Sequence, residues 1–494
     1  MAKRGVCVKL IDIKPKKLTP AHSSRAFGEL VCSNSLKSTD NNTASGLLKA
    51  ELEILGCSLL EIAKGCTVAA GSALAVDRKK FEENVTNAIK AEKLIEIECR
   101  EVEDFSGLGG YTVIATGPLT TGKLADNISK CLGGGLYFFD AAAPIVSYES
   151  LDLEKCFVGN RYGKTFSAYE KTDTAQECHF DRAKRAEKSH KKTTQERCEE
   201  EISPLASLGR NDTRHQRNEG ETGGEQGDYI NCPLTKDEYY TFVDELITAK
   251  TAPLKNFDTR SNFACLQGQN CDDDQRSKTV ENDIKTFAGC QPVEYIAKSG
   301  RDSLRYGPMR PVGLKLPDGT RPYAVLQLRR ENANGTMYNL VGFQTNLTFG
   351  EQKRVFGLIP ALKNCEYLRY GVMHRNTYIN APTVINSRFE CLTYPNVFVA
   401  GQLSGVEGYV ESIASGLITA IDIVNKIEGK PPLELPQTTI LGSLTNYLTR
   451  PNNNFQPMNA NFGLLPPVDV RKKDERKRAY GERAIKDLRL KIGN

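Results

Sequence analysis

The 494-residue chain has no tryptophan, only 5 methionines and 5 histidines, and no long apolar run. A membrane-spanning helix needs about 20 consecutive apolar residues, and none of this chain's apolar stretches approaches that length. The basic start, Met1 to Gly5, runs directly into a strand-like segment and lacks the pattern of a signal peptide. These absences argue against the membrane classes and predict a cytoplasmic protein.

The cysteines lack the pairing that many metal sites and disulfide frameworks use. There are 15 of them, and no two stand in a C-x-x-C pair. The groupings Cys178–His179 with Cys198, and Cys265 with Cys271, have no standard zinc spacing. Without an export signal, a disulfide framework is not expected either. Most of the cysteines are therefore predicted to be small buried apolar residues, and no metal site is predicted.

The composition that remains is that of an ordinary folded protein. Hydrophobic residues make up 39%, charged residues 26%, and the net charge is +5. This mild positive charge permits a nucleic-acid partner but does not require one. The most basic part is the run from Arg471 to Lys491, which has a helical pattern. Both a solvated surface helix and a helix that faces RNA remain open for this run.

Strand and helix patterns alternate along the chain. Residues Gly5 to Asp12 and Thr112 to Gly117 have short, β-branched strand patterns, and apolar residues between Asn41 and Lys64 recur at helical spacing. A further helix pattern covers Val410 to Lys426 and stops near Gly429. Alternation of this kind predicts an α/β fold around a largely parallel sheet.

Two polar stretches interrupt these patterns. Residues 165–227 and 265–285 are rich in charged and polar residues and have no apolar periodicity. Such stretches bury too little surface to offset the entropy of ordering, so both are predicted to be disordered insertions. The second half of the chain has strand patterns at Pro322 to Leu328, Tyr338 to Thr345 and Asn396 to Ala400.

Three segments have the features of a dinucleotide site. Asp12 ends the first strand, where a carboxylate can accept both hydroxyls of an adenosine ribose. A later strand ends in the small residues Ala115, Thr116 and Gly117, which let a cofactor approach closely. A third strand runs into a glycine-rich turn and a helix, an order that presents backbone N–H groups to a pyrophosphate or a flavin ring. The turn residues predicted to bind the cofactor are Gly401, Gln402, Gly405, Glu407 and Gly408.

Five segments carry more specific patterns. They are Leu30–Leu36 (LVCSNSL), Pro308–Leu314 (PMRPVGL), Val341–Thr345 (VGFQT), Tyr370–Thr377 (YGVMHRNT) and Ala400–Ser412 (AGQLSGVEGYVES). All five resemble the folate- and flavin-dependent tRNA uracil-5 methyltransferases (TrmFO). A related family of large tRNA-modifying flavoproteins, which install carboxymethylaminomethyl groups, shares the last segment but not the first. The resemblance covers residues 1–160, 229–262 and 286–490.

The resemblance implies an FAD-binding, Rossmann-like domain that is split by an inserted α+β domain. The first part of the FAD-binding domain is expected at residues 1–150 and the second part at residues 346–430. The inserted domain is expected between them, at residues 151–345. A C-terminal tail with a basic helix is expected at residues 431–494.

The resemblance also implies a reaction. Methylenetetrahydrofolate supplies a one-carbon unit, reduced FAD supplies electrons, a uracil in the tRNA T-loop gains a 5-methyl group, and NAD(P)H reduces the flavin again. Uracil C5 becomes nucleophilic when a thiolate adds to C6, and a proton must later leave C5. Cys290 and Cys32 match the family's two functional cysteines, and we assign Cys290 as the nucleophile and Cys32 as its partner near the flavin. His374 and Arg375 are expected in the active-site wall that binds the substrate.

One part of the family pattern is missing. An FAD enzyme of this type opens with a strand, a G-x-G-x-x-G turn and a helix before the strand that ends in the acid, and Met1 to Gly5 matches only the last turn of that helix. The glycine turn would hold the pyrophosphate, so we expect the chain as written to bind FAD weakly. Two explanations remain open. Either the natural protein has about 20 further residues upstream, or the chain is a relative that keeps RNA binding without redox chemistry.

The predicted function is formation of 5-methyluridine in tRNA, and two alternatives stay beside it. One is another flavin-dependent tRNA-modifying enzyme with the same cofactors, against which the Cys-Ser-Asn-Ser setting of Cys32 argues. The other is a catalytically inactive protein that binds tRNA.

Overall fold

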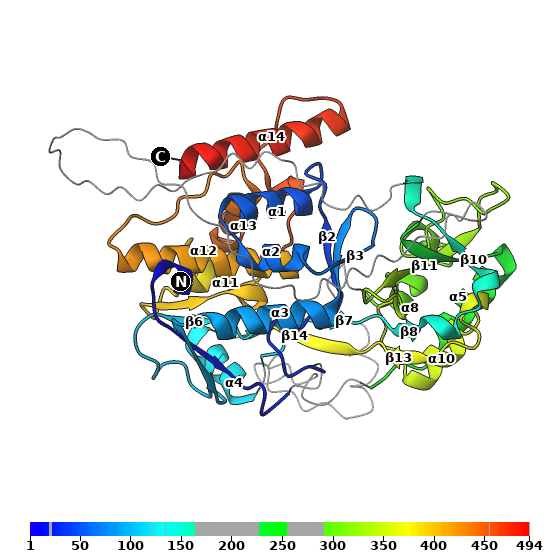
Figure 1. Cartoon of the computed structure of the whole chain (residues 1–494), viewed down its shortest axis with the longest axis horizontal. Coiled ribbons are helices and arrows are strands. Elements are labelled where there is room, and N and C mark those ends of the chain that lie inside the picture. Colours follow the sequence, from blue (N-terminus) through cyan, green and yellow to red (C-terminus); the bar gives the residue numbers. More distant parts are fainter. Residues whose placement is uncertain are drawn as a thin grey trace, which may run out of the picture. The chain divides into compact units, whose positions relative to one another are not determined.

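The computed structural model describes residues 1–18, 22–120, 122–133, 135–163, 227–253, 291–453 and 455–493 (Figure 1). At residues 135–140, 374 and 375 it describes the course of the backbone. The predicted disordered insertions near 165–227 and 265–285 lie outside the described residues, apart from Gly227. All residues named from here on with a position in the fold belong to one compact unit.

Helices and strands alternate along the described chain. The α-helices are α1 (Ala44–Ile54), α2 (Ser58–Lys64), α3 (Arg78–Ala91), α4 (Gly122–Leu132), α5 (Lys236–Thr248), α8 (Val293–Lys298), α9 (Ser303–Tyr306), α10 (Phe349–Phe356), α11 (Ala381–Val384), α12 (Tyr409–Ile427), α13 (Ile440–Thr449) and α14 (Lys473–Ile492). The strands are β1 (Val8–Asp12), β2 (Ser35–Ser38), β3 (Thr67–Val68), β4 (Ala73–Val76), β5 (Ile95–Cys99), β6 (Thr112–Ile114), β7 (Gly135–Ala141), β8 (Ile145–Ser147), β9 (Phe157–Val158), β10 (Tyr229–Leu234), β11 (Ala324–Arg330), β12 (Met337–Leu340), β13 (Tyr367–Arg369), β14 (Met373–Ile379) and β15 (Val397–Val399). Within these described parts, no helix is both long and apolar enough to cross a membrane.

Two pairs of parallel strands link distant parts of the chain. β1 pairs with β5 up to the residue pair Asp12–Cys99, and the chain between them runs through α1, α2 and α3. β6 pairs with β15 up to the residue pair Ile114–Val399, although the whole middle of the chain separates them. Parallel strands need a long crossover connection, usually with helices. These pairs confirm the predicted α/β fold.

A six-stranded sheet, in the order β13-β8-β12-β11-β10-β9, uses the middle of the chain. All of its neighbouring strands are antiparallel. Helix α5 packs on β10 and against α8 and α10, and Phe242, Phe343 and Phe356 contact one another in the core between them. The strands of this sheet extend from β8, which lies before residue 151, to β13, which lies after residue 345. The domain bounds 151–345 stay a prediction.

Glycines explain where the observed elements are shorter than predicted. The predicted helix from Asn41 to Lys64 is two helices, because the chain turns at Gly56, where φ is 74°. The predicted strand from Tyr338 to Thr345 ends as β12 before Gly342, where φ is 77°. Residues with a Cβ rarely adopt such values, so both glycines end regular structure. Helix α12 confirms the helix predicted from Val410 to Lys426.

The main apolar core includes residues of α1, α12, α13 and α14, and it contains a buried carboxylate. Glu51 of α1 accepts hydrogen bonds from the backbone N–H groups of Ile440 (2.8 Å) and Leu441 (2.9 Å) at the start of α13. Burial raises the pKa of Glu51 to about 7 in spite of these two bonds. On the same helix, burial lowers the pKa of Lys49 to about 8. The contact between α1 and α13 therefore involves a group that titrates near neutral pH.

Replacing Glu51 with glutamine is expected to remove a pH dependence of stability. The folded-state pKa of about 7 lies above the ordinary value of 4.5, so the folded state binds the extra proton and stability falls as pH rises between these values. We expect the free energy of unfolding of the wild type, relative to Glu51→Gln, to fall by on the order of 3 kcal/mol across this window.

Urea unfolding at a series of pH values measures this difference. The exposed Glu61→Gln change is the matched control. A Glu51→Gln protein whose stability follows the wild-type pH curve would contradict the prediction.

Candidate functional site

A cavity of about 1120 Å³ lies where the ends of β6 and β15 meet α2, α3 and α12. Small-molecule pockets commonly measure about 300–1,000 Å³, so this cavity has room for a dinucleotide-sized ligand. Its walls are mainly apolar and come from parts of the chain that are far apart in sequence. They include residues 27–33, 115–119, 400–402 and 407–413.

The carboxyl ends of the parallel strands β6 and β15 open side by side at this cavity. Ala115, Thr116 and Gly117 follow β6, Gly401 and Gln402 follow β15, and all of them line the cavity. A Cβ at Gly117 or Gly401 would meet no atom within 4 Å, so both positions leave the backbone open to a ligand. Open α/β sheets bind ligands outside the carboxyl ends of their strands. The structure thus brings together the predicted cofactor residues of these two segments.

Helix α12 begins at the cavity without a side-chain cap. Gly408, which precedes the helix, has a φ of 116°, and a Cβ there would collide with the Glu411 carboxylate. The uncapped N–H groups of the first turn carry partial positive charge, so the start of α12 favours an anionic or carbonyl group of a ligand. In the turn before the helix, Gln402 Nε2 donates a hydrogen bond to Glu407 Oε2 at 2.5 Å.

A buried carboxylate oxygen beside this helix start has an open acceptor position. Glu411 is fully buried and its Oε1 pairs with Lys37 Nζ at 2.9 Å, whereas its Oε2 accepts no hydrogen bond among the residues that the structure describes. An open acceptor, a glycine turn and an uncapped helix together fit the polar edge of a planar ring such as the isoalloxazine of FAD. Gly401, Gln402 and Gly408 are the residues that would hold it.

Two predicted site residues do not line the cavity, and the structure does not describe a third. Asp12, at the end of β1, accepts a hydrogen bond from the backbone N–H of Lys14 at 2.8 Å and is not among the residues that line the cavity. Gly405 packs against the ring of Phe455, so a Cβ there would collide with that ring. Cys290 lies outside the described residues. The roles assigned to these three residues stay predictions.

Of the two cysteines predicted to be functional, Cys32 is the one that the structure describes. It lines the cavity, its backbone N–H donates to Tyr409 Oη at 2.8 Å, and its Sγ lies 3.8 Å from the carbonyl oxygen of Ala141. Tyr409 is the first residue of α12 and Ala141 is the last residue of β7. Cys32 is therefore held between the helix start that fits a flavin ring and the end of a strand.

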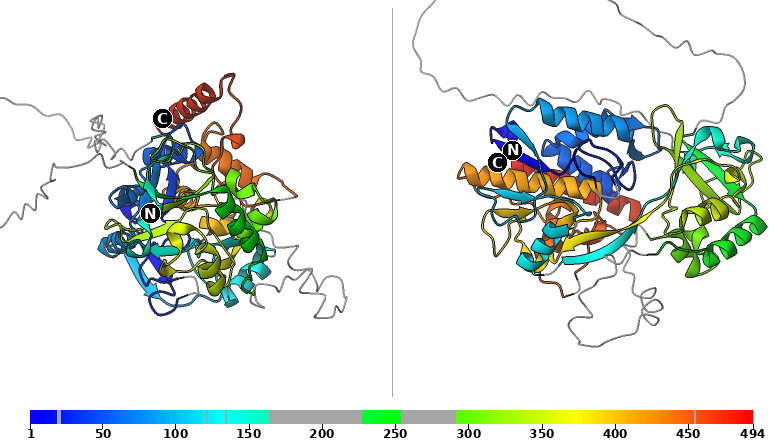
Figure 2. Two further views of the ribbon diagram at one scale, coloured as in Figure 1. Left: turned by 90° about the vertical axis from the view of Figure 1, so that its right-hand side faces the viewer. Right: turned by 90° about the horizontal axis from the view of Figure 1, so that it is seen from below.

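Strand β7 brings the predicted substrate residues close to Cys32. β7 and β14 form a long antiparallel pair, in cyan and yellow in Figure 2, in which Ala141 lies opposite Met373. His374 and Arg375 are the next two residues of β14. Their backbone thus follows Met373, which pairs with the Ala141 that Cys32 contacts. Cys32, His374 and Arg375 therefore lie in one region of the fold.

Three arginines from separate elements hold the segment Leu30–Asn34, here called the Cys32 loop. Arg78, at the start of α3, donates to the carbonyl oxygen of the loop's first residue and to that of Cys32, the latter at 3.2 Å. Arg369, at the end of β13, donates to the carbonyl oxygen of Val31 at 2.8 Å. Guanidinium groups therefore bind the loop's first three carbonyl groups.

Arg329 of β11 is the third arginine, and it acts together with Asn34. Arg329 is 7% exposed and donates to Asn34 Oδ1 at 3.0 Å and to Ser33 Oγ at 2.9 Å. Asn34 is fully buried, and its Nδ2 donates to the carbonyl oxygens of Val76 (3.0 Å) and Arg330 (2.9 Å). One amide side chain thus joins the Cys32 loop to β4 and β11, with its oxygen and its nitrogen both paired.

Near the Cys32 loop, three arginines face one carboxylate, that of Glu331. Glu331 is 1% exposed and pairs with Arg78 Nε at 2.5 Å, and its Oε1 has no partner in the described part of the chain. Burial lowers the pKa of Arg329 and of Arg369. At Arg78 burial acts in the same direction, but Glu331 outweighs it and raises the pKa. The surroundings of the Cys32 loop are therefore positively charged.

Sequence reasoning did not single out Tyr409, Asn34, Arg78 or Arg369. Tyr409 and Asn34 lie inside the segments that resemble the family, so those motifs contained a signal for them. Arg78 and Arg369 lie in none of the five segments. Only their contacts with the Cys32 loop identify them.

Replacing Asn34 with alanine should destabilise the protein through the Cys32 loop. The change leaves Arg329 Nε without its acceptor and removes the amide donor from two carbonyl oxygens, and each unpaired buried group costs about 1–3 kcal/mol. We expect the free energy of unfolding to fall by about 2–4 kcal/mol in urea. The matched control is Asn87→Ala, at an exposed position of α3. Equal stability of the two variants would refute the role of Asn34.

Comparison with known proteins places these features in a family. The model of the family described as Glucose inhibited division protein A (GIDA) matches residues 1–207 and 264–431. The methylenetetrahydrofolate–tRNA-(uracil-5-)-methyltransferase TrmFO of Acetivibrio thermocellus is 41% identical over 493 residues, which cover 99% of this chain and 93% of that protein. The protein of the same name from Thermotoga maritima is 41% identical over 494 residues, which cover 99% of this chain and 94% of its own length.

Solved structures show a related fold. GidA of Aquifex aeolicus in its form II crystal has a TM-score of 0.57 at 14% identity, and the match covers 99% of this chain and 70% of GidA. Its form I crystal has a TM-score of 0.52 at 15% identity, over 94% of this chain and 72% of GidA. At such low identity these structures support the α/β fold alone. The family follows from the sequence relatives: this chain belongs to the GIDA family and, within it, to the methylenetetrahydrofolate–tRNA-(uracil-5-)-methyltransferases named TrmFO.

Proposed function

We propose that this chain forms 5-methyluridine in the T-loop of tRNA as a folate- and FAD-dependent methyltransferase. Relatives that are 41% identical over nearly the whole chain carry the name of this activity. In the structure, the observation that supports it most directly is the position of Cys32, which Tyr409 holds at the cavity beside the start of α12. Methylation of uracil at C5 needs thiol chemistry next to the group that supplies the electrons.

The cofactor of the cavity is FAD, the one-carbon donor is methylenetetrahydrofolate, and NAD(P)H is the reductant. When bound and reduced, FAD supplies the two electrons that convert the transferred methylene group into a methyl group. Gly401, Gln402 and Gly408 hold the flavin ring at the uncapped start of α12. The apolar side chains of α3 and α12 that line the cavity keep water away from the reacting groups.

Two thiols share the chemistry on uracil. A thiolate adds to C6 and makes C5 nucleophilic, and we assign this addition to Cys290. After the new carbon bond has formed at C5, the C5 proton must leave and the bond between C6 and sulfur must break. We assign acceptance of the C5 proton to Cys32, because its Sγ lies between the start of α12 and the end of β7. Loss of the proton and expulsion of the thiolate return Cys290 to its starting state.

Tyr409 and Arg78 position Cys32 for this step. Tyr409 accepts the backbone N–H of Cys32 at 2.8 Å, and Arg78 donates to its carbonyl oxygen at 3.2 Å. The two peptide groups that flank the cysteine are therefore fixed from opposite sides of the loop by different elements. His374 and Arg375, which continue β14 beside the Cys32 contact, are the side chains proposed to bind the substrate.

Replacing Cys32 with serine should lower the rate of 5-methyluridine formation by about 10²-fold or more, because proton transfer by a positioned side chain contributes about 10²–10⁴-fold. The assay combines the purified chain with FAD, NAD(P)H, methylenetetrahydrofolate and a tRNA transcript, and mass spectrometry of nucleosides detects the product. The matched control is Cys7→Ser, at an exposed cysteine. If Cys32→Ser is as active as this control, the assigned role is wrong.

Replacing Gly408 with alanine should weaken FAD binding by about tenfold, since a Cβ at φ 116° collides with Glu411 and left-handed strain costs about 1–2 kcal/mol. Titration of the purified chain with FAD, followed by visible absorption, measures the affinity. Gly350→Ala is the control, because a Cβ at Gly350 meets no atom within 4 Å. Equal affinity in the two variants would contradict the placement of the flavin ring.

The same titration of the wild type separates the two candidate functions. A chain that binds tRNA and takes up no FAD would support the alternative function, an inactive tRNA-binding protein.

A further inference from the structure

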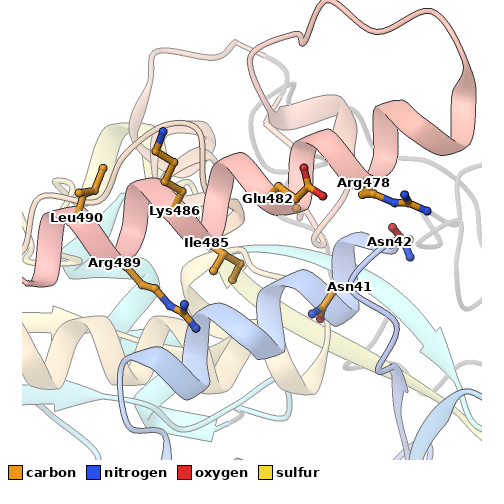
Figure 3. Close-up of a pocket in the computed structure, with 9 residues that line it drawn as sticks. Asn41, Asn42, Arg478, Glu482, Ile485, Lys486, Arg489 and Leu490 are labelled. Carbon is orange, nitrogen blue, oxygen red and sulfur yellow. The ribbon is translucent and has the colours of Figure 1, made fainter. Parts of the chain in front are cut away.

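Helix α14 and the residues that precede α1 form a groove of about 650 Å³ (Figure 3). Helix α14 packs against α1 through its buried residues Gly481, Ala484 and Leu488. A Cβ at Gly481 would lie 3.3 Å from the carbonyl oxygen of Asn41, so this glycine lets the two segments approach closely. This groove, here called the α14 groove, shares no lining residue with the flavin cavity.

Two arginines mark the ends of the α14 groove. Arg478 and Arg489 are 11 positions apart in one helix, which is three turns and about 16 Å, so they lie on the same face. In Figure 3, Arg478 extends toward Asn42, and Arg489 extends toward α1. Ile485 lies between the two arginines and fills the floor of the groove.

The positive charge of the chain is concentrated on this helix. Between Lys472 and Lys491 there are nine lysines and arginines against four aspartates and glutamates. This excess equals the net charge of the whole chain, +5, so the remaining residues balance one another. Residues 472–491 therefore carry an excess of positive charge that attracts polyanions.

The basic side chains of the groove are among those of α14 that have no partner in the described part of the chain. Lys472, Lys477 and Lys491 pair with carboxylates, and Arg483 donates to two proline carbonyl oxygens. By contrast, three basic side chains that line the groove make no ion pair or hydrogen bond with any described residue. These side chains are Arg478, Lys486 and Arg489.

We propose that the α14 groove binds the phosphate backbone of the tRNA substrate, an inference that rests on the proposed function for the identity of the RNA. Arg478 and Arg489 each bind a phosphate, because a guanidinium presents two parallel donors that match phosphate oxygens. The side-chain amide of Asn41 supplies a further uncharged donor beside them, whereas the amide of Asn42 already donates to Asp40 Oδ1 at 2.9 Å. Glu482, the carboxylate among the groove residues, points away from α1 in Figure 3 and leaves that side to the arginines.

The test compares two double variants with the same change in net charge. Arg478→Gln with Arg489→Gln removes both groove arginines, whereas Lys473→Gln with Lys477→Gln removes two lysines of the same helix that do not line the groove. Anisotropy of a labelled tRNA transcript measures the affinity of the purified full chain across a range of salt concentrations. Circular dichroism and thermal unfolding check that both variants fold like the wild type.

We expect the groove variant to bind tRNA about tenfold more weakly and its salt dependence to fall, because each lost phosphate contact reduces the slope of log K against log salt by about 0.7–0.9. The matched lysine variant should change affinity less than twofold. Equal losses in the two variants would show attraction by net charge alone and overturn the proposal, as would an unchanged affinity in the groove variant. A competition experiment gives a further check. If polyglutamate displaces the labelled tRNA as effectively as unlabelled tRNA does, the proposal is also overturned, because the groove would then recognise any acidic chain.

Failure of the proposal and failure of the proposed function are distinguishable. The groove variant should need about tenfold more tRNA to reach half of its maximal rate of 5-methyluridine formation, because the lost contacts bind tRNA and lie outside the cavity. Suppose that the wild type makes no 5-methyluridine, and that tRNA affinity falls in the groove variant but not in the lysine variant. That result would support tRNA binding by the α14 groove and contradict the methyltransferase function.

Discussion

Hydrogen bonds from three arginines to the Cys32 loop hold together the parts of the molecule that the reaction needs. Arg78 comes from α3, Arg329 from β11 and Arg369 from β13, so one five-residue segment is attached both to the first part of the chain and to the six-stranded sheet. The same segment donates to Tyr409 at the start of α12. If these bonds were absent, nothing in this region would keep the Cys32 thiol beside the glycine turn.

Such a cluster is tolerated because each guanidinium in it has at least one acceptor. Burying a guanidinium costs several kcal/mol unless it is paired, and the carbonyl groups of the Cys32 loop, together with Ser33, Asn34 and Glu331, provide the acceptors. Bonds of this kind are about twice as strong as neutral ones. The positive charge that remains suits the proposed chemistry, since thiolate addition places negative charge on the uracil ring.

The sequence contains good evidence for features that depend on local pattern and poor evidence for the cluster. Helix α12 and the turn at Gly401 are predictable, because apolar periodicity and glycines after a strand are properties of short segments. Arg78 and Arg369 act on residues 46 and 338 positions away, and no local pattern encodes such a contact. The break at Gly56 was missed because the apolar spacing on both of its sides is helical. Asn34 lies between these two cases. The sequence identifies the motif that contains it, but not the residues with which it forms hydrogen bonds.

The α14 groove and Cys32 are also close along the chain, and this sets a limit on how one RNA can engage both. Asn41 follows Cys32 by nine positions, with β2 between them, and nine extended residues span at most about 30 Å. A nucleic acid whose backbone lies in the groove therefore has its neighbouring nucleotides within reach of the cavity. Because phosphate contacts fix position but carry no sequence information, the separation of groove and thiol would select the reacting uracil by its distance along the RNA from the bound phosphates.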